Sequence, residues 1–135
     1  MKTSPKMQSV IEQLAKQHGL YLSQAEAYLR LEMPGFDRLV IENIGCQRIS
    51  VAHYYEQNGD LVADPDVVFF TGYGAWAPIE ITQVMAVYRR YAELDDAGQT
   101  IVRFDVRGQA DLAAFTEEWA QNLLDQGWLK RGSVG

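Results

Sequence analysis

One pair of side chains in the sequence could carry out acid–base chemistry, His53 and Asp64. The run from Gln47 to Phe70 alternates like two strands around Asn58-Gly59, a dipeptide typical of a type I′ hairpin turn. If these two residues form the turn, His53 and Asp64 face each other across the hairpin, with Cβ atoms about 5 Å apart. A carboxylate beside an imidazole favours the charged ring and fixes its tautomer, which is half of a general-base arrangement.

The sequence supplies no nucleophile for this pair. Ser50 and Tyr54 lie an odd number of positions from His53, so the period of a strand places them on its opposite face. We therefore favour a hydrogen bond that holds the hairpin together over a small hydrolase-like enzyme that uses His53 and Asp64. We expect no metal or cofactor, because the nearby aspartates lack the spacing of a calcium-binding loop.

A second candidate surface combines tyrosine and arginine. It consists of Tyr88, Arg89, Arg90 and Tyr91, with Arg103 and Arg107 expected across a second hairpin. Aromatic rings interleaved with guanidinium groups can stack the bases and hold the phosphates of single strands. Acidic residues in the same segment cancel the local charge, so an ion-paired sheet face is favoured over a nucleic-acid site.

Paired aromatic residues form a third candidate surface. Tyr54 and Tyr55 are adjacent, as are Phe69 and Phe70, so alternation directs one member of each pair away from a singly covered sheet face. An aromatic side chain left exposed in this way marks a protein contact or a dimer interface. A protein-binding face is therefore the leading functional hypothesis.

The elements that must position these residues follow from periodicity and turn chemistry. A helix is expected from Pro5, with Ser4 as its cap, to about Gly19, and another from about Gln109 to Gly127. Four strands between Ala27 and Phe70 are joined by turns too short for parallel crossovers, which predicts an antiparallel meander.

The segment 79–94 is ambiguous, because its first residues alternate like a strand and its later ones repeat like a helix. The β-rich run that follows favours a hairpin pairing 87–94 with 100–106. The expected fold is thus α+β, with an antiparallel meander sheet of about five or six strands and the N- and C-terminal helices packed on one face.

Composition limits the class of protein. The 135 residues predict one domain spanning 1–135, and Met1–Ser4 and Arg131–Gly135 are expected to be loose. A net charge of −6 argues against a general duplex-DNA binder, and the single cysteine, Cys46, excludes a disulfide framework. No segment resembles a membrane span or a secretory signal, so we expect a cytoplasmic protein.

The run RISVAHYYEQNGDLVADPDVVF, preceded by PGFDRLVIENIG and followed by a helix that ends in Gln-Gly-Trp, resembles an uncharacterised bacterial domain family. The resemblance covers about Tyr28 to Leu129. It implies a setting on plasmids and integrative elements, or within polyvalent proteins, and it assigns no catalytic residue.

Three function classes follow. The first is a non-enzymatic accessory or protein-interaction module, with a protein partner or self-association. The second is a single-strand nucleic-acid binder that uses the Arg/Tyr surface, and the third is the enzyme that uses His53 and Asp64. The first is favoured because no catalytic set is complete and the net charge is acidic.

Overall fold

The structure is a computed structural model that describes residues 1–84 and 87–129. In these residues the chain forms one helix, then eight strands, then a second helix. In order they are α1 (Pro5–Gln17), β1 (Tyr28–Leu31), β2 (Arg38–Gly45), β3 (Arg48–Gln57), β4 (Asp60–Phe70), β5 (Ala77–Gln83), β6 (Val87–Arg90), β7 (Ala92–Leu94), β8 (Ile101–Phe104) and α2 (Val106–Gln126).

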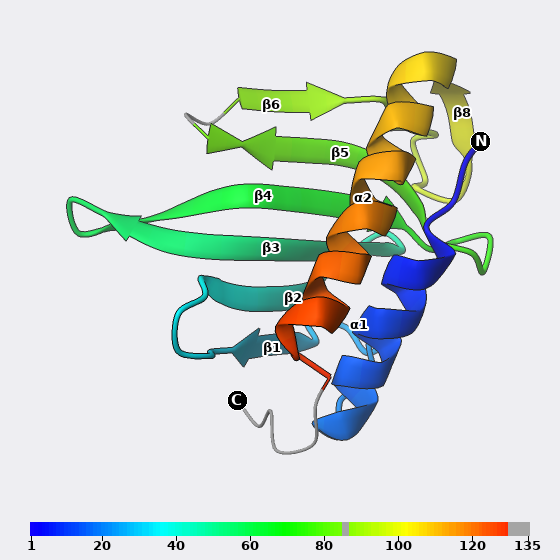
Figure 1. The fold of residues 1–135 in the computed structure, drawn as a ribbon. Helices are drawn as coiled ribbons and strands as arrows, with labels where there is room; N and C mark the ends of the chain where they lie inside the picture. Colours follow the sequence, from blue (N-terminus) through cyan, green and yellow to red (C-terminus); the bar gives the residue numbers. More distant parts are fainter. Residues whose placement is uncertain (85–86, 130–135) are drawn as a thin grey trace.

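Strands β1 to β6 form one antiparallel sheet in which each strand pairs with the next along the chain. Strands β7 and β8 form a separate two-stranded hairpin. Helices α1 and α2 lie side by side on one face of the large sheet (Figure 1). The predicted α+β fold, with an antiparallel meander and both helices on one face, is confirmed.

The main core lies between the helices and the sheet. The β strands contribute a row of cross-strand neighbours with exposed fractions of 0–6%: Ile41, Val51, Val67 and Ile81. The helices supply the facing side chains, which are Met7, Val10, Ile11, Leu14, Leu112, Trp119 and Leu123. Helical spacing on one side and strand spacing on the other thus bury the apolar residues against each other.

A smaller core lies on the other side of the sheet. Phe70 and Ile79 are buried there with Ala92 of β7, and the β7–β8 hairpin supplies further partly buried side chains. Phe69, by contrast, belongs to the main core. Both phenylalanines are therefore covered, each on its own face, and neither leaves an exposed aromatic ring.

The β3–β4 turn forms as expected. Asn58 and Gly59 have φ values of 53° and 86°, as a type I′ turn requires, and the predicted register holds as far as the pair Tyr54 and Ala63. The next pair is Ala52 with Asp66, because β4 carries one extra residue. His53 therefore lies opposite a β-bulge, and its predicted direct pairing with Asp64 is wrong.

The segment 79–94 is a strand region in the described residues, and its predicted pairing is only partly right. Ala92–Leu94 does pair with Ile101–Phe104, as expected, but Val87–Arg90 pairs with β5 and extends the large sheet. The chain leaves that sheet at Tyr91, whose ring lies against Gly108 at the start of α2. A tertiary contact thus divides what the sequence suggested was one long strand.

Helix α1 begins at Pro5 as predicted, but its predicted side-chain cap is wrong, and α2 begins earlier than predicted. The Ser4 side chain makes no cap on α1; its hydroxyl hydrogen-bonds to that of Thr116 at 2.7 Å. Glu117 of α2 instead accepts hydrogen bonds from the backbone N–H groups of Lys6 and Met7, at 3.1 and 3.0 Å. Helix α2 starts at Val106, three residues before the predicted position, with Asp105 as its cap.

The N-terminal prediction is also wrong at Ser4. Ser4 is fully buried, and its backbone N–H donates to the carbonyl of Trp76 at 2.8 Å. The predicted loose C-terminal segment, Arg131–Gly135, lies outside the described residues.

Candidate functional site

His53 lies on the side of the sheet that faces the helices. Its ring centroid is 5.5 Å from that of Trp119 and 6.0 Å from that of Trp128, and its Nδ1 atom lies 3.2 Å from the carbonyl oxygen of Asp37. Burial lowers the pKa of the imidazole, whereas the charge of Asp64 raises it only as a minor effect. The surroundings favour a neutral, packed histidine.

The predicted Arg/Tyr surface is divided between different parts of the fold. Arg89 pairs with Ile81 and so belongs to the helix-covered face, whereas Arg90 pairs with Glu80 on the opposite face. Tyr91 packs against the main core.

Arg103 is not opposite Arg89 or Arg90, because it lies on β8 and pairs with Glu93 of β7. Its guanidinium forms an ion pair with Glu93, and Arg90 reaches the same carboxylate at 3.3 Å. The arginines of the predicted surface thus share an acidic partner instead of forming a continuous basic strip.

The side of the sheet opposite the helices, here called the open face, gathers polar and aromatic side chains from six strands. Cross-strand pairing and alternation place on it Tyr28, Arg30, Arg38, Glu42, Arg48, Ser50, Tyr54, Glu56, Asp66, Glu80, Thr82, Tyr88 and Arg90. The β7–β8 hairpin covers this face around Val68, Phe70 and Ile79. No other element among residues 1–84 and 87–129 packs on the rest of the open face.

Ser50 and Asp66 form the most buried polar contact on the open face. Ser50 is 8% exposed and its hydroxyl donates to a carboxylate oxygen of Asp66 at 2.6 Å. Burial raises the pKa of the Asp66 carboxyl, the hydrogen bond from Ser50 opposes this, and the charge of Glu80 adds to the rise. This pair lacks an imidazole, because His53 lies on the other face.

Tyr54 and Tyr88 lie around this pair. The pKa of the Tyr54 phenol is raised by burial and then by the charges of Asp66 and Glu42. The Tyr88 hydroxyl donates to Glu80 at 2.7 Å, and its pKa is raised by burial and by this carboxylate, whereas the charges of Arg90 and Arg48 oppose the rise. Tyr55, which alternates with Tyr54, is half-buried on the other side of the sheet. The adjacent residues Tyr54 and Tyr55 thus lie on opposite sides of the sheet, and of these two only Tyr54 belongs to the open face.

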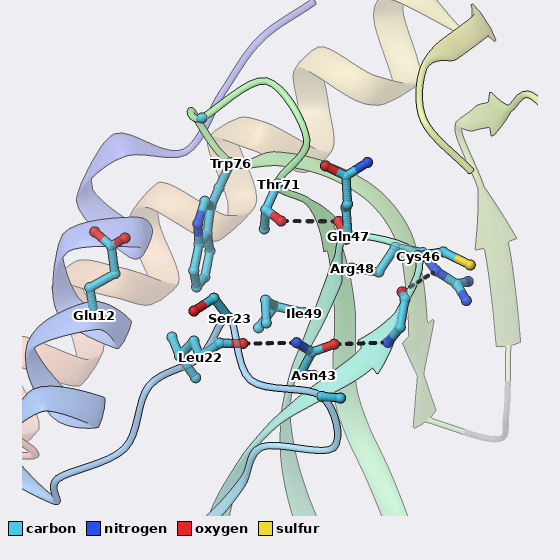
Figure 2. A pocket seen from close by; sticks show the side chains of 13 residues that line it. Glu12, Leu22, Ser23, Asn43, Cys46, Gln47, Arg48, Ile49, Thr71 and Trp76 are labelled. Atoms are coloured by element: carbon cyan, nitrogen blue, oxygen red, sulfur yellow. Dashed lines mark hydrogen bonds between the residues drawn. The ribbon is translucent and has the colours of Figure 1, made fainter. Parts of the chain in front are cut away.

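A pocket of about 520 Å³ lies at the end of the sheet, between α1, the loop after it, the β2–β3 turn and the 71–76 loop (Figure 2). Trp76, Leu22 and Ile49 form its apolar wall. The side chains of Cys46 and Arg48 point away from Trp76.

Hydrogen bonds join several of the groups that line this pocket. Thr71 donates to the carbonyl of Gln47 at 3.1 Å, and the Asn43 amide donates to the carbonyl of Leu22 at 2.9 Å. These bonds join the loop after α1, the β2–β3 turn and the 71–76 loop. We therefore interpret the pocket as the place where these three loops meet and not as a binding site.

The comparisons with known proteins identify the family of the chain, and they assign it no activity, ligand or partner. The sequence model of a family described as a domain of unknown function, DUF6908, matches residues 9–129. The chain belongs to this family. A search of curated proteins found no match, and neither did a search of solved structures. None of the described helices of this DUF6908 domain is long and apolar enough to span a membrane.

Sequence reasoning missed the open face as a unit, although its signal was present. Glu42, Ser50 and Glu80 each lie on the polar side of a strand in which apolar and polar residues alternate. Only the cross-strand register shows that they lie close together. Within residues 1–84 and 87–129 there is no group of three or more His, Cys, Asp or Glu side chains that could hold a metal ion. The chemistry that the open face offers is recognition through rings, carboxylates and guanidinium groups.

Proposed function

We propose that this DUF6908 domain is a non-enzymatic protein-interaction module and that the open face of its sheet is the binding surface. The observation that carries this proposal is the exposure of Tyr28 and Tyr88, 53% and 54%, on a face that the helices leave uncovered. Tyrosine is enriched at protein interfaces, because it combines a large apolar ring with a hydroxyl that remains hydrogen-bonded.

The surroundings of the candidate catalytic residues favour binding over hydrolysis. His53 packs against Trp119 and Trp128, on the other side of the sheet from the Ser50 hydroxyl. The Ser50 hydroxyl donates to a carboxylate instead. A serine nucleophile needs a base that can take its proton and be held in place, and this arrangement supports none.

The biological setting is proposed on the sequence resemblance alone. We infer an accessory role in bacterial mobile elements, with the domain acting in the cytoplasm.

The proposal is tested by affinity capture from an extract of the cells from which the protein comes. The wild-type domain is compared with Tyr28→Ser/Tyr88→Ser, and with the control Tyr21→Ser/Val102→Ser, which removes two side chains that are 73% and 61% exposed outside the large sheet. We expect the wild type and the control to retain the same protein and the open-face variant to lose it. Equal retention by all three would reject the open face as the binding surface.

The nucleic-acid alternative is tested in parallel with a labelled single-stranded oligonucleotide. We expect no rise in fluorescence anisotropy even at low salt, because Arg90 and Arg103 are paired with Glu93. Binding that weakens steeply with salt and is lost in Arg89→Ala/Arg90→Ala would favour a single-strand binder instead.

A further inference from the structure

Three carboxylates lie on the open face without a cationic partner. Glu42, Asp66 and Glu80 come from β2, β4 and β5, and the cross-strand register places them around Ser50. In the described part of the chain, none of the three lies within ion-pair distance of a lysine, arginine or histidine. Asp66 and Glu80 accept hydrogen bonds from neutral groups, the hydroxyls of Ser50 and Tyr88.

The arginines on the open face contact groups other than these three carboxylates. Arg90 reaches Glu93, and the Nε atom of Arg48 donates to the carbonyl of Gly45 at 3.2 Å. Arg38 lies 3.4 Å from Glu32 and also contacts Glu56. Arg30 belongs to β1, the strand at the edge of the sheet. The three carboxylates around Ser50 therefore form no ion pair in the described residues, and they outnumber the two arginines, Arg48 and Arg90, whose charges reach this part of the face.

The carboxylates on the open face shift the pKa values of the ionisable groups beside them. Beyond the effect of burial, Glu80 raises the pKa of Asp66, and Asp66 and Glu42 raise the pKa of Tyr54. Each of these shifts means that a further negative charge is disfavoured there, so a positive charge is favoured.

Aromatic rings surround the carboxylates. Tyr28, Tyr54 and Tyr88 lie on the same face, on β1, β3 and β6. A ring face attracts an ammonium or guanidinium group, and a carboxylate beside it neutralises the charge. This combination suits the side chains of lysine and arginine, whose aliphatic stems can lie along the rings.

We propose that the open face binds a segment of a partner protein that bears lysine or arginine. The inference rests on the proposed function, because it assigns a partner chemistry to the same face. Charge complementarity to the unpaired carboxylates selects this occupant, whereas an acidic segment or a nucleic-acid phosphate would meet repulsion.

The test measures binding of a fluorescent octapeptide of alternating lysine and serine by anisotropy, with a glutamate–serine octapeptide as the comparison. The open-face variant is Glu42→Gln/Asp66→Asn/Glu80→Gln. The matched control, Asp96→Asn/Asp111→Asn/Glu118→Gln, removes the same number of negative charges from exposed positions outside the open face. A second variant, Glu42→Gln/Glu80→Gln, leaves the Ser50–Asp66 hydrogen bond in place in case the triple variant does not fold.

We expect the lysine peptide to bind the wild type, the open-face variants to bind it at least about tenfold more weakly, and the control to stay within about twofold. Equal weakening in the control would show general charge attraction and overturn the inference, as would the absence of lysine-peptide binding or preferential binding of the glutamate peptide. The capture experiment with Tyr28→Ser/Tyr88→Ser is independent of peptide charge. A loss of capture there together with no lysine-peptide binding would leave the proposed function standing and reject only the basic partner.

Discussion

His53 owes its surroundings to the aromatic side chains of the C-terminal region. Its ring packs on Trp119 and Trp128, and burial is the main cause of its lowered pKa. Such contacts stabilise the fold in proportion to the apolar area that they cover and to the ring–ring attraction. A catalytic imidazole would instead need an accessible nitrogen beside a nucleophile.

We expect His53→Ala to lower the free energy of unfolding by about 1–3 kcal/mol at pH 7.5, measured by urea denaturation. The folded-state pKa lies below the ordinary value of 6.5, so the stabilisation by the neutral ring is complete above that value. It declines as the pH falls from 6.5 towards the folded-state pKa. The difference between wild type and variant should therefore shrink between pH 7.5 and pH 5. A variant as stable as the wild type would contradict the packing role.

At the same scale, the sequence predicted the β3–β4 turn but not the placement of His53. Asn58 and Gly59 determine the turn locally, because both accept a positive φ. The bulge opposite His53 contains Pro65, which has no N–H to donate to a neighbouring strand, so β4 did carry a sign of the irregularity that the register argument left out. A one-residue irregularity is sufficient to break a register argument that is correct for four pairs.

Gly108 shows how one element positions another. A Cβ atom at this position of α2 would lie 2.4 Å from a ring carbon of Tyr91 and 2.7 Å from a carboxylate oxygen of the capping residue Asp105. The absence of a side chain therefore lets α2 begin directly against the segment that joins β6 to β7.

We expect Gly108→Ala to destabilise the protein by about 1–3 kcal/mol, although alanine is the better helix former. The cause is overlap with the Tyr91 ring, so Tyr91→Leu/Gly108→Ala should lose less stability than the sum of the two single substitutions. Thermal denaturation of the four proteins measures this coupling. Strict additivity, or a stabilised Gly108→Ala, would show that Tyr91 does not restrict the start of α2.

Elements with strong local signals were predicted and those set by tertiary contacts were not. Helix α1 shows a regular apolar stripe, and the predicted helix end is confirmed by the φ of 68° at Gly19. The division of 87–94 into β6 and β7 depends on the contact between Tyr91 and α2, which lies outside any short window of sequence.

The composition of the open face could likewise not be predicted from local sequence signals, because it depends on contacts between strands. Alternation shows that Glu42 and Glu80 are on the polar side of their strands, but only the order of six strands shows that they share a surface. Candidate residues chosen by proximity in sequence, such as Arg89 and Arg90, were separated by that same alternation.

At the scale of the whole molecule, one buried polar contact joins the N-terminal segment, the sheet and α2. Gln109 is fully buried; its amide nitrogen donates to the carbonyls of Lys2 and Pro78 at 2.7 and 3.1 Å, and its oxygen accepts from the Lys2 backbone N–H at 2.9 Å. Residues 107 positions apart along the chain are thereby joined. Such a bond adds little net free energy when formed, but its loss leaves buried backbone groups unpaired.

Gln109→Ala should therefore cost about 2–3 kcal/mol of unfolding free energy, since an unpaired buried carbonyl adds to the loss of packing. Gln121→Ala is the matched control: Gln121 also lies on α2 and bonds to Lys6, but at an exposed position, so a change of less than about 0.5 kcal/mol is expected. Urea denaturation measures both, and hydrogen exchange at the amide of Ser4, which donates to Trp76, reports whether the N-terminal segment opens. If Gln109→Ala were no worse than Gln121→Ala, with unchanged exchange at Ser4, the attachment of the N-terminus would depend on apolar packing of α1 and not on this buried amide.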